Sequence, residues 1–181
     1  MEPSDDIFEL LNDTHDRISF SCGVPSLDTY LHRQAGQDMR RRLASVFVLR
    51  APNSAAVIGY YTLSNSAVTA TELPPAVVKK FGRYPTLPAT LLGRLAVDSR
   101  FKRQRFGQRL LLNALQRSAH NEVASALVVV DALDDSICPF YEKYGFQRFS
   151  LASLRLFLPM ETLQRSMQLP ARKSPGDFPA R

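Results

Sequence analysis

The stretch from Ala126 to Asp131 reads ALVVVD, an unbroken apolar run with polar residues on either side. Such a run is typical of a strand covered on both faces, so the fold must place helices on both sides of a sheet. Leu91–Asp98 (LLGRLAVD) is expected to form a strand, and Gln108–Ala119 a helix with one apolar side. Strand, helix and strand in this order indicate parallel strands joined by a helical crossover.

The rest of the chain supplies more elements of both kinds. Ser26 can cap a first helix, in which apolar residues recur at helical spacing as far as Met39. The expected strands are 45–50, 57–64 and 154–158, and short helices are expected around 76–81, within the proline-rich stretch 69–90, and from about 136 to Gly145. This order predicts the α/β class, with a mixed central sheet flanked by helices.

The length of 181 residues suits one domain, which we expect to span residues 1–165. Residues 166–181 contain three prolines and no apolar period, which is typical of a frayed tail. The net charge of +6 attracts polyanions, so nucleic acid or an acidic cofactor is a sensible partner. A solvated basic surface explains the same charge, and composition leaves both interpretations open.

Several classes of protein are disfavoured. Cys22 and Cys138 lie far apart and the three histidines lack metal-ligand spacing, so we expect no disulfide framework, no metal and a reducing cytoplasm. The acidic N-terminus lacks the apolar segment of a secretory signal. The uncharged stretch 51–71 contains too many polar residues to cross a membrane.

A basic turn from Arg100 to Gly107 joins the strand at 91–98 to the helix at 108–119. A helix N-terminus holds phosphate well, because unpaired N–H groups and the positive end of the helix dipole converge there. Four cations in the turn add to this effect: Arg100, Lys102, Arg103 and Arg105. Basic turns before helices are common, so the turn alone does not identify a ligand.

The six residues Lys102-Arg103-Gln104-Arg105-Phe106-Gly107 resemble the pyrophosphate loop of the GNAT acetyltransferases, Q/R-x-x-G-x-G/A. Further motifs follow the order of one branch of that family, the toxins that acetylate aminoacyl-tRNA and are encoded beside a ribbon-helix-helix antitoxin. These motifs are Phe20-x-Cys22-Gly23, Leu27-Asp28-x-Tyr30-Leu31, residues 59–64 (GYYTLS), Arg83-Tyr84-Pro85, residues 92–98 (LGRLAVD) and Phe140-Tyr141-x-x-x-Gly145-Phe146. The resemblance covers residues 7 to 160 and implies the GNAT fold.

The resemblance also implies acetyl-CoA as the acetyl donor, and Tyr141 as the general acid that protonates the departing thiolate. A phenol stays protonated at neutral pH and can donate its proton. The pantetheine arm is expected to pair with a strand edge at 95–97, which parts from the strand at 128–130, and an N–H near Val97 is expected to stabilise the developing negative charge. The residues expected to hold acetyl-CoA are Leu95, Ala96, Val97, Lys102, Arg103, Gln104, Arg105, Phe106, Gly107 and Gln108.

Arg105 departs from the family pattern, which has glycine at that position. Keeping a left-handed backbone with a non-glycine residue costs about 1–2 kcal/mol. The alternative is that the loop shifts and that Arg103 or Arg105 supplies charge-assisted hydrogen bonds instead.

The expected acceptor is the α-amine of aminoacyl-tRNA, whose RNA would be bound by Arg40, Arg41, Arg83 and Arg94. Expected partners are acetyl-CoA, aminoacyl-tRNA, a ribbon-helix-helix antitoxin and a second copy of the chain. When Tyr141 is taken alone, packing of a short helix against the sheet is the favoured explanation, and solvation explains each arginine as well as RNA binding does. A GNAT enzyme acting on a small or protein amine, or a degenerate binding scaffold, remains an alternative. No carboxylate is singled out as a general base.

Overall fold

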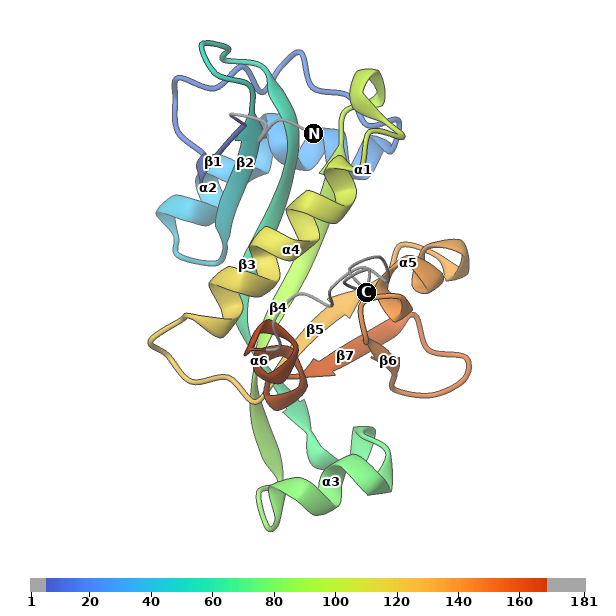
Figure 1. The fold of residues 1–181 in the computed structure, drawn as a ribbon. Helices are drawn as coiled ribbons and strands as arrows, with labels where there is room; N and C mark the ends of the chain where they lie inside the picture. The colour runs from blue at the N-terminus through green and yellow to red at the C-terminus, as the bar shows by residue number, and fades with distance from the viewer. Residues whose placement is uncertain (1–5, 169–181) are drawn as a thin grey trace, which may run out of the picture.

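The computed structural model describes residues 6–168, whose strands form one sheet in the order β1-β2-β3-β4-β5-β7-β6 (Figure 1). The strands are β1 (Ile7–Leu10), β2 (Ser45–Arg50), β3 (Val57–Thr69), β4 (Thr86–Val97), β5 (Leu127–Asp131), β6 (Gln147–Arg148) and β7 (Arg155–Pro159). The helices are α1 (Pro25–Thr29), α2 (Ala35–Arg40), α3 (Pro75–Phe81), α4 (Phe106–Ala119), α5 (Cys138–Glu142) and α6 (Met160–Gln168). The mixed α/β architecture predicted from the sequence is confirmed.

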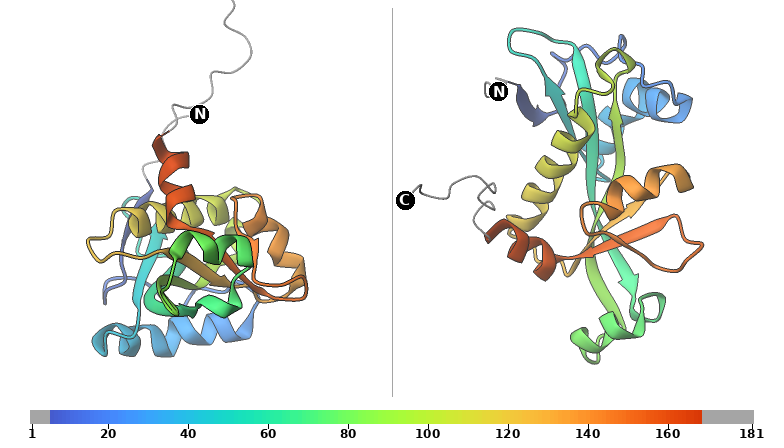
Figure 2. Two further views of the ribbon diagram at one scale, coloured as in Figure 1. Left: turned by 90° about the horizontal axis from the view of Figure 1, so that it is seen from below. Right: turned by 45° about the vertical axis from the view of Figure 1, so that its right-hand side comes forward.

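The only parallel pair in the described sheet is β4 with β5, and α4 makes the crossover between them. The first four residues of β5 are buried, as the apolar run predicted. Helices cover both faces of the sheet (Figure 2, left). Along β2, Phe47 and Leu49 pack into the cluster that contains α4, whereas Val46 and Val48 pack against the helical stretch 25–40.

The sheet divides where β4 leaves β5. Their pairing runs for four rungs, from Ala89 opposite Leu127 to Leu92 opposite Val130. A shift in the β3–β4 register leaves Gly93 as an extra residue in β4, which then continues beside β3 as far as Val97. Beyond the fourth rung β5 turns away towards α5, so β4 has a free edge there (Figure 1). We call this divergence the fork.

The region 69–90 is more ordered than the sequence predicted. β3 continues to Thr69 and β4 begins at Thr86, so the two strands form a long arm with α3 at its tip (Figure 1). Pro88 is tolerated because its missing N–H would point towards β5, whose pairing with β4 begins only at Ala89. Its carbonyl faces the same side and accepts a hydrogen bond from the Ala126 N–H.

Other boundaries also differ from expectation. The first helix begins at Pro25, without a side-chain cap from Ser26, and passes through a π-helical turn at Tyr30–Gln34 before α2. β1 was not predicted from the mildly apolar residues 7–11. α6 extends to Gln168, so residues 166–168 of the predicted tail are helical, and the remainder of that tail lies outside the described residues. None of the described helices has the length and apolarity needed to cross a membrane.

Candidate active site

A cavity of about 290 Å³ occupies the fork. Its walls are the free edge of β4, the segment before α1, and the residues that follow β5. The lining residues are Cys22, Val24, Leu27, Leu92, Gly93, Arg94, Leu95, Ala96, Val97, Lys102, Asp131, Leu133, Ile137 and Tyr141. A narrow, mostly apolar site with a few polar groups suits a small acyl group and the chain that carries it.

The fold brings together six of the residues predicted for the site. Arg94, Leu95, Ala96, Val97, Lys102 and Tyr141 all line the cavity. Arg103, Gln104 and Arg105 are exposed in the turn beyond it, and Phe106, Gly107 and Gln108 form the first turn of α4. The other predicted RNA-binding residues lie outside the cavity: Arg40 and Arg41 are exposed where α2 ends, and Arg83 is exposed on the arm.

Tyr141 lies in α5, which packs beside the fork. Its side chain is buried, with Phe140 and Phe146 at 5.1 and 5.6 Å between ring centroids. Burial, with the nearby Cys138, raises the pKa of the Tyr141 phenol to about 12. The left-handed Gly145, with φ of 90°, ends the turn that follows α5 and directs Phe146 inward. The phenol is therefore protonated at neutral pH and available as a proton donor.

The turn before α4 keeps a left-handed backbone without glycine. Arg105 has φ of 64° and ψ of 12° and is the residue that precedes the first turn of α4. Arg103 is also left-handed, with φ of 63°. Arg105 thus adopts the left-handed conformation that glycine would adopt without steric cost. The N–H groups of the first turn of α4 carry the positive end of a 14-residue helix.

Asp98 fixes the start of the same turn. Its carboxylate is almost completely buried and accepts hydrogen bonds from the side chain and backbone N–H of Arg100 and from the backbone N–H of Ser21. Burial alone would raise the pKa of Asp98, but these hydrogen bonds outweigh it and lower the pKa. Asp98 therefore ties the turn to the segment at 20–22, which forms another wall of the cavity.

The guanidinium of Arg94 packs over an aromatic ring. It lies 3.7 Å from the centroid of the buried Tyr30, and no carboxylate within the described residues forms an ion pair with it. A groove of about 690 Å³ adjoins the cavity and shares four lining residues with it: Leu27, Gly93, Arg94 and Asp131. Arg94 thus stands where the groove meets the fork.

Eight lining residues were not predicted for the site. Cys22, Val24 and Leu27 come from the chain around the start of α1, and Gly93 is the bulged residue of β4. The motif that contains Cys22 was visible in the sequence, but its place beside β4 depends on the tertiary fold. Burial raises the pKa of the Cys22 thiol to about 11, and the nearby Asp28 acts in the same direction, so this thiol is not a nucleophile at neutral pH. The remaining four are Leu92, Asp131, Leu133 and Ile137.

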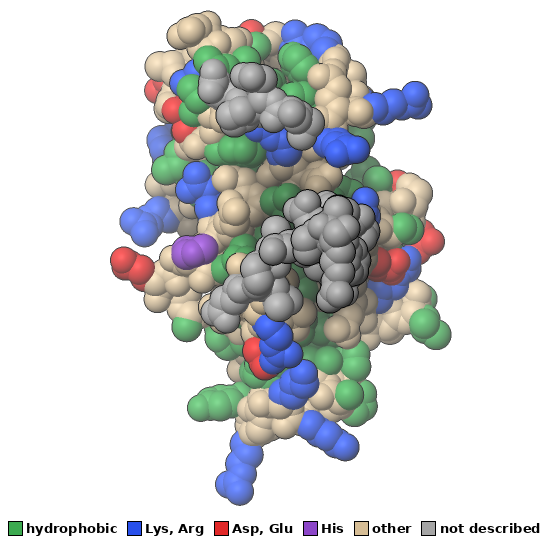
Figure 3. Space-filling model, in the orientation of Figure 1, with side chains coloured by type: hydrophobic (Ala, Val, Ile, Leu, Met, Phe, Trp, Pro, Cys, Tyr) green, Lys and Arg blue, Asp and Glu red, His purple; other side chains and the backbone are tan. Residues whose placement is uncertain are grey.

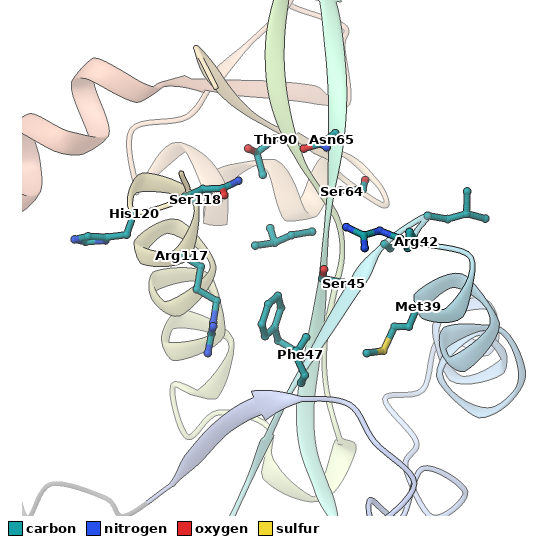
Figure 4. A pocket seen from close by; sticks show the side chains of 15 residues that line it. Met39, Arg42, Ser45, Phe47, Ser64, Asn65, Thr90, Arg117, Ser118 and His120 are labelled. Carbon is teal, nitrogen blue, oxygen red and sulfur yellow. The ribbon is translucent and has the colours of Figure 1, made fainter. Parts of the chain in front are cut away.

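A larger cavity, about 890 Å³, lies elsewhere. It adjoins the start of β2, with Arg117 and His120 on one side and Arg42 and Met39 on the other (Figure 4). None of the residues predicted for the site lines it. Over the described part of the chain, no group of three or more histidine, cysteine or acidic side chains is arranged to hold a metal ion.

Comparisons with known proteins agree with this geometry. Residues 82–161 match the family described as "Acetyltransferase (GNAT) domain". A tRNA-acetylating toxin of Mycobacterium tuberculosis is 31% identical over 153 residues, covering 83% of this chain and 90% of the toxin. A probable toxin TacT of Sinorhizobium fredii is 27% identical over 165 residues, covering 84% of this chain and 90% of its own length.

Among solved structures, AtaT in complex with acetyl-methionyl-tRNA superposes with a TM-score of 0.81 at 27% identity, over 90% of this chain and 99% of that one. The mixed sheet, the fork and the relatives agree on one assignment. The chain belongs to the GNAT acetyltransferases and is related to their tRNA-acetylating toxins.

Proposed function

We propose that this protein transfers the acetyl group of acetyl-CoA to the α-amine of aminoacyl-tRNA and acts as the toxin of a toxin–antitoxin pair. The observation that carries the proposal is the cavity in the fork, which joins a buried, protonated Tyr141 to the basic turn before α4. The sequence relatives named above are toxins, and one structural relative was solved with an acetylated aminoacyl-tRNA. A complex of AtaT and AtaR was solved with acetyl-CoA.

The residues present suit acetyl-CoA. The free edge of β4 at 95–97 has backbone groups that β5 does not pair, which suits the amides of a pantetheine arm. Lys102 lies at the cavity wall nearest the basic turn, where a diphosphate would meet the N–H groups of the first turn of α4. Arg103 and Arg105 are exposed beside it and supply further positive charge. Acetyl-CoA itself supplies the acetyl group as a reactive thioester.

Tyr141 serves as the general acid in this proposal. As the amine nitrogen forms a bond to the acyl carbon and the C–S bond breaks, negative charge passes to sulfur. The Tyr141 hydroxyl donates its proton to that sulfur. Because burial raises the phenol pKa, the hydroxyl is protonated at every pH at which the enzyme is expected to work. A backbone N–H of β4 near Val97 stabilises the oxygen that carries negative charge during the attack.

The RNA is assigned to basic surface around the fork. Arg94 stands at the entrance from the groove, and Arg40, Arg41 and Arg83 are exposed on α2 and on the arm. Lysine and arginine side chains are spread over the upper part of the molecule and over the tip of the arm (Figure 3). Such side chains contact phosphates and position the RNA without reading its sequence.

The proposal extends to partners. AtaT has been solved bound to the C-terminus of the antitoxin AtaR. We propose that this protein is likewise neutralised by a small antitoxin of the ribbon-helix-helix type, and that it forms a homodimer. Charged tRNA as acceptor implies that the protein works in the cytoplasm.

The test is incubation of the protein with labelled acetyl-CoA and total charged tRNA. We expect label in aminoacyl-tRNA, and a loss of at least about 100-fold in the rate for Tyr141→Phe, since the thiolate then leaves without its proton donor. Calorimetry should show that this variant still binds acetyl-CoA.

The matched control is Tyr144→Phe, which removes a hydroxyl from a ring that packs against Phe140 outside the cavity. It should keep the wild-type rate. An unimpaired Tyr141→Phe variant would remove Tyr141 from its role. Acetylation of free small amines, with no transfer to charged tRNA, would show the acceptor to be a different one.

A further inference from the structure

The cavity and the adjoining groove share one acidic residue. Within the described chain, Asp131 is the only carboxylate that lines either of them, and it lines both. It directly follows Val130, which forms the last rung with Leu92. The register therefore puts Asp131 level with the bulged Gly93, at the point where the strands part. A side chain at this point would contact a substrate that enters the fork from the groove.

Alternation along β5 places Asp131 and Tyr141 on opposite faces of the sheet. Val128 and Val130 belong to the core cluster that contains α4 and Tyr141. Leu127 and Val129 belong to the cluster on the other face, so Asp131 continues their side. The groove also lies on that side, since α1 residues line it. An acyl carbon in the fork would have the phenol on one side and the carboxylate on the other.

The surroundings of Asp131 leave its carboxylate able to accept a proton or a hydrogen bond. Its partner is Arg155, the residue opposite on β7, with 3.5 Å between Arg155 Nε and an Asp131 oxygen. This contact is not a hydrogen bond, and the buried Arg155 Nε has no hydrogen-bond partner among the described residues. The Asp131 side chain is 55% exposed, towards the groove. Arg155 thus holds the carboxylate without saturating it.

We propose that Asp131 stabilises the positive charge that develops on the attacking amine and accepts its proton. This inference rests on the proposed acetyl transfer. As the N–C bond forms, the nitrogen becomes cationic while the acyl oxygen becomes anionic. The nitrogen then gives one proton to the Asp131 carboxylate, the C–S bond breaks, and Tyr141 gives its own proton to the sulfur. Asp131 passes its proton to water in the groove, and Tyr141 regains one from solvent.

The experiment measures kcat and KM for Asp131→Asn and Asp131→Glu, with acetyl-CoA and charged tRNA. Asparagine keeps the shape but cannot carry the charge, so we expect kcat to fall about 10–100-fold while KM and acetyl-CoA affinity stay near wild type. Glutamate should restore part of kcat. The control is Asp135→Asn, which removes an exposed carboxylate that also pairs with an arginine but lies outside both cavities. It should stay within about twofold of wild type.

Four outcomes bear on the two proposals. A kcat of Asp131→Asn within about twofold of wild type overturns the inference, and so does a loss found only in KM or in acetyl-CoA affinity. The kcat of Asp131→Asn relative to wild type is also measured with amino-acid methyl esters as acceptors. If the wild type acetylates the esters but not charged tRNA, the proposed acceptor is wrong and the role of Asp131 is judged on the esters. A wild type that acetylates neither overturns both proposals.

Discussion

Arg105 shows what a single residue type does and does not reveal about its backbone. The sequence identified position 105 as the departure from the family loop, but it left open whether the loop shifts or keeps its shape. The structure keeps the left-handed conformation, at a cost of about 1–2 kcal/mol for a residue with a Cβ. Residue type alone does not settle such a choice, because the turn is also held by the packing of α4 at one end and by the hydrogen bonds of Asp98 at the other.

Paired substitutions at this position measure that strain. Arg105→Gly and Arg105→Ala remove the same charge, but only glycine adopts φ of 64° without steric cost. We expect the glycine variant to be more stable to urea than the alanine variant by about 1 kcal/mol, after a small offset from its more flexible unfolded chain. Acetyl-CoA affinity should be equal in the two. If the alanine variant is as stable as the glycine variant, the left-handed backbone at position 105 is not strained.

The place of Asp131 in the candidate site is likewise not predictable from its residue type. Tyr141 and Lys102 could be assigned to one site from the sequence, because they lie in motifs that are continuous in the sequence, and the structure places both at the cavity. Asp131 ends an apolar strand and looks like any polar residue after a core segment. Its importance depends on the β4–β5 register and on the parting of the strands, both of which are long-range properties.

Among the elements, those with a strong local pattern were predicted well. β2 has the predicted bounds, and β5 and α4 differ from prediction by one and two residues at their starts. The arm was missed because Pro85 and Pro88 suggested a loop. Only the partner strand, and the absence of pairing with β5 at Pro88, make a strand acceptable there.

The contact between β3 and α4 gives a prediction at this scale. A Cβ on Gly59 would lie 2.7 Å from Leu110 Cδ1 and 2.8 Å from the Ala96 carbonyl oxygen. We therefore expect Gly59→Ala to lower the free energy of unfolding by about 1–3 kcal/mol. Because Gly59 pairs with Val97, acetyl-CoA should also bind more weakly. Urea denaturation and calorimetry measure the two effects.

Gly36→Ala is the control for that substitution. Gly36 lies in α2 with ordinary helical backbone, and its added Cβ would meet only the flexible ends of Arg17 and Arg40. Alanine there should leave stability unchanged or raise it by up to about 1 kcal/mol. If Gly59→Ala is as stable as wild type, β3 does not hold α4 and β4 as closely as described.

At the scale of the whole molecule, the positive charge is spread along its length. Arg40 and Arg41 are exposed at the end of α2, and Arg83 is exposed with Lys79 and Lys80 at or just after α3. Figure 1 shows α2 in the upper half of the molecule and α3 at the far tip of the arm, and Figure 3 shows lysine and arginine side chains in both regions. An RNA bound at the fork would have to be extended to touch both regions. Composition gave the net charge but not this distribution, because the arm itself was not predicted.

Salt titration tests which of these cations contact RNA. If Arg83 contacts a phosphate, Arg83→Gln should raise KM for charged tRNA and reduce the slope of log KM against log salt by about one. The double variant Arg40→Gln/Arg41→Gln should reduce it by about two. Acetyl-CoA affinity should not change. Arg165→Gln, which removes an exposed cation paired with Glu161 on α6, should keep the wild-type slope, and an identical slope for Arg83→Gln would exclude that contact.

The fork has a mechanical consequence. Within the described residues, only four backbone rungs and the Ala126–Pro88 hydrogen bond join the two parts of the sheet. Across the fork, the N-terminal and C-terminal strands are therefore held together by side-chain packing and by the α4 crossover. In the proposed site, acetyl-CoA would lie between these two parts and contact both. Because binding to the folded state alone raises its stability by mass action, we expect bound acetyl-CoA to hold the two parts together and release of the product to weaken that contact.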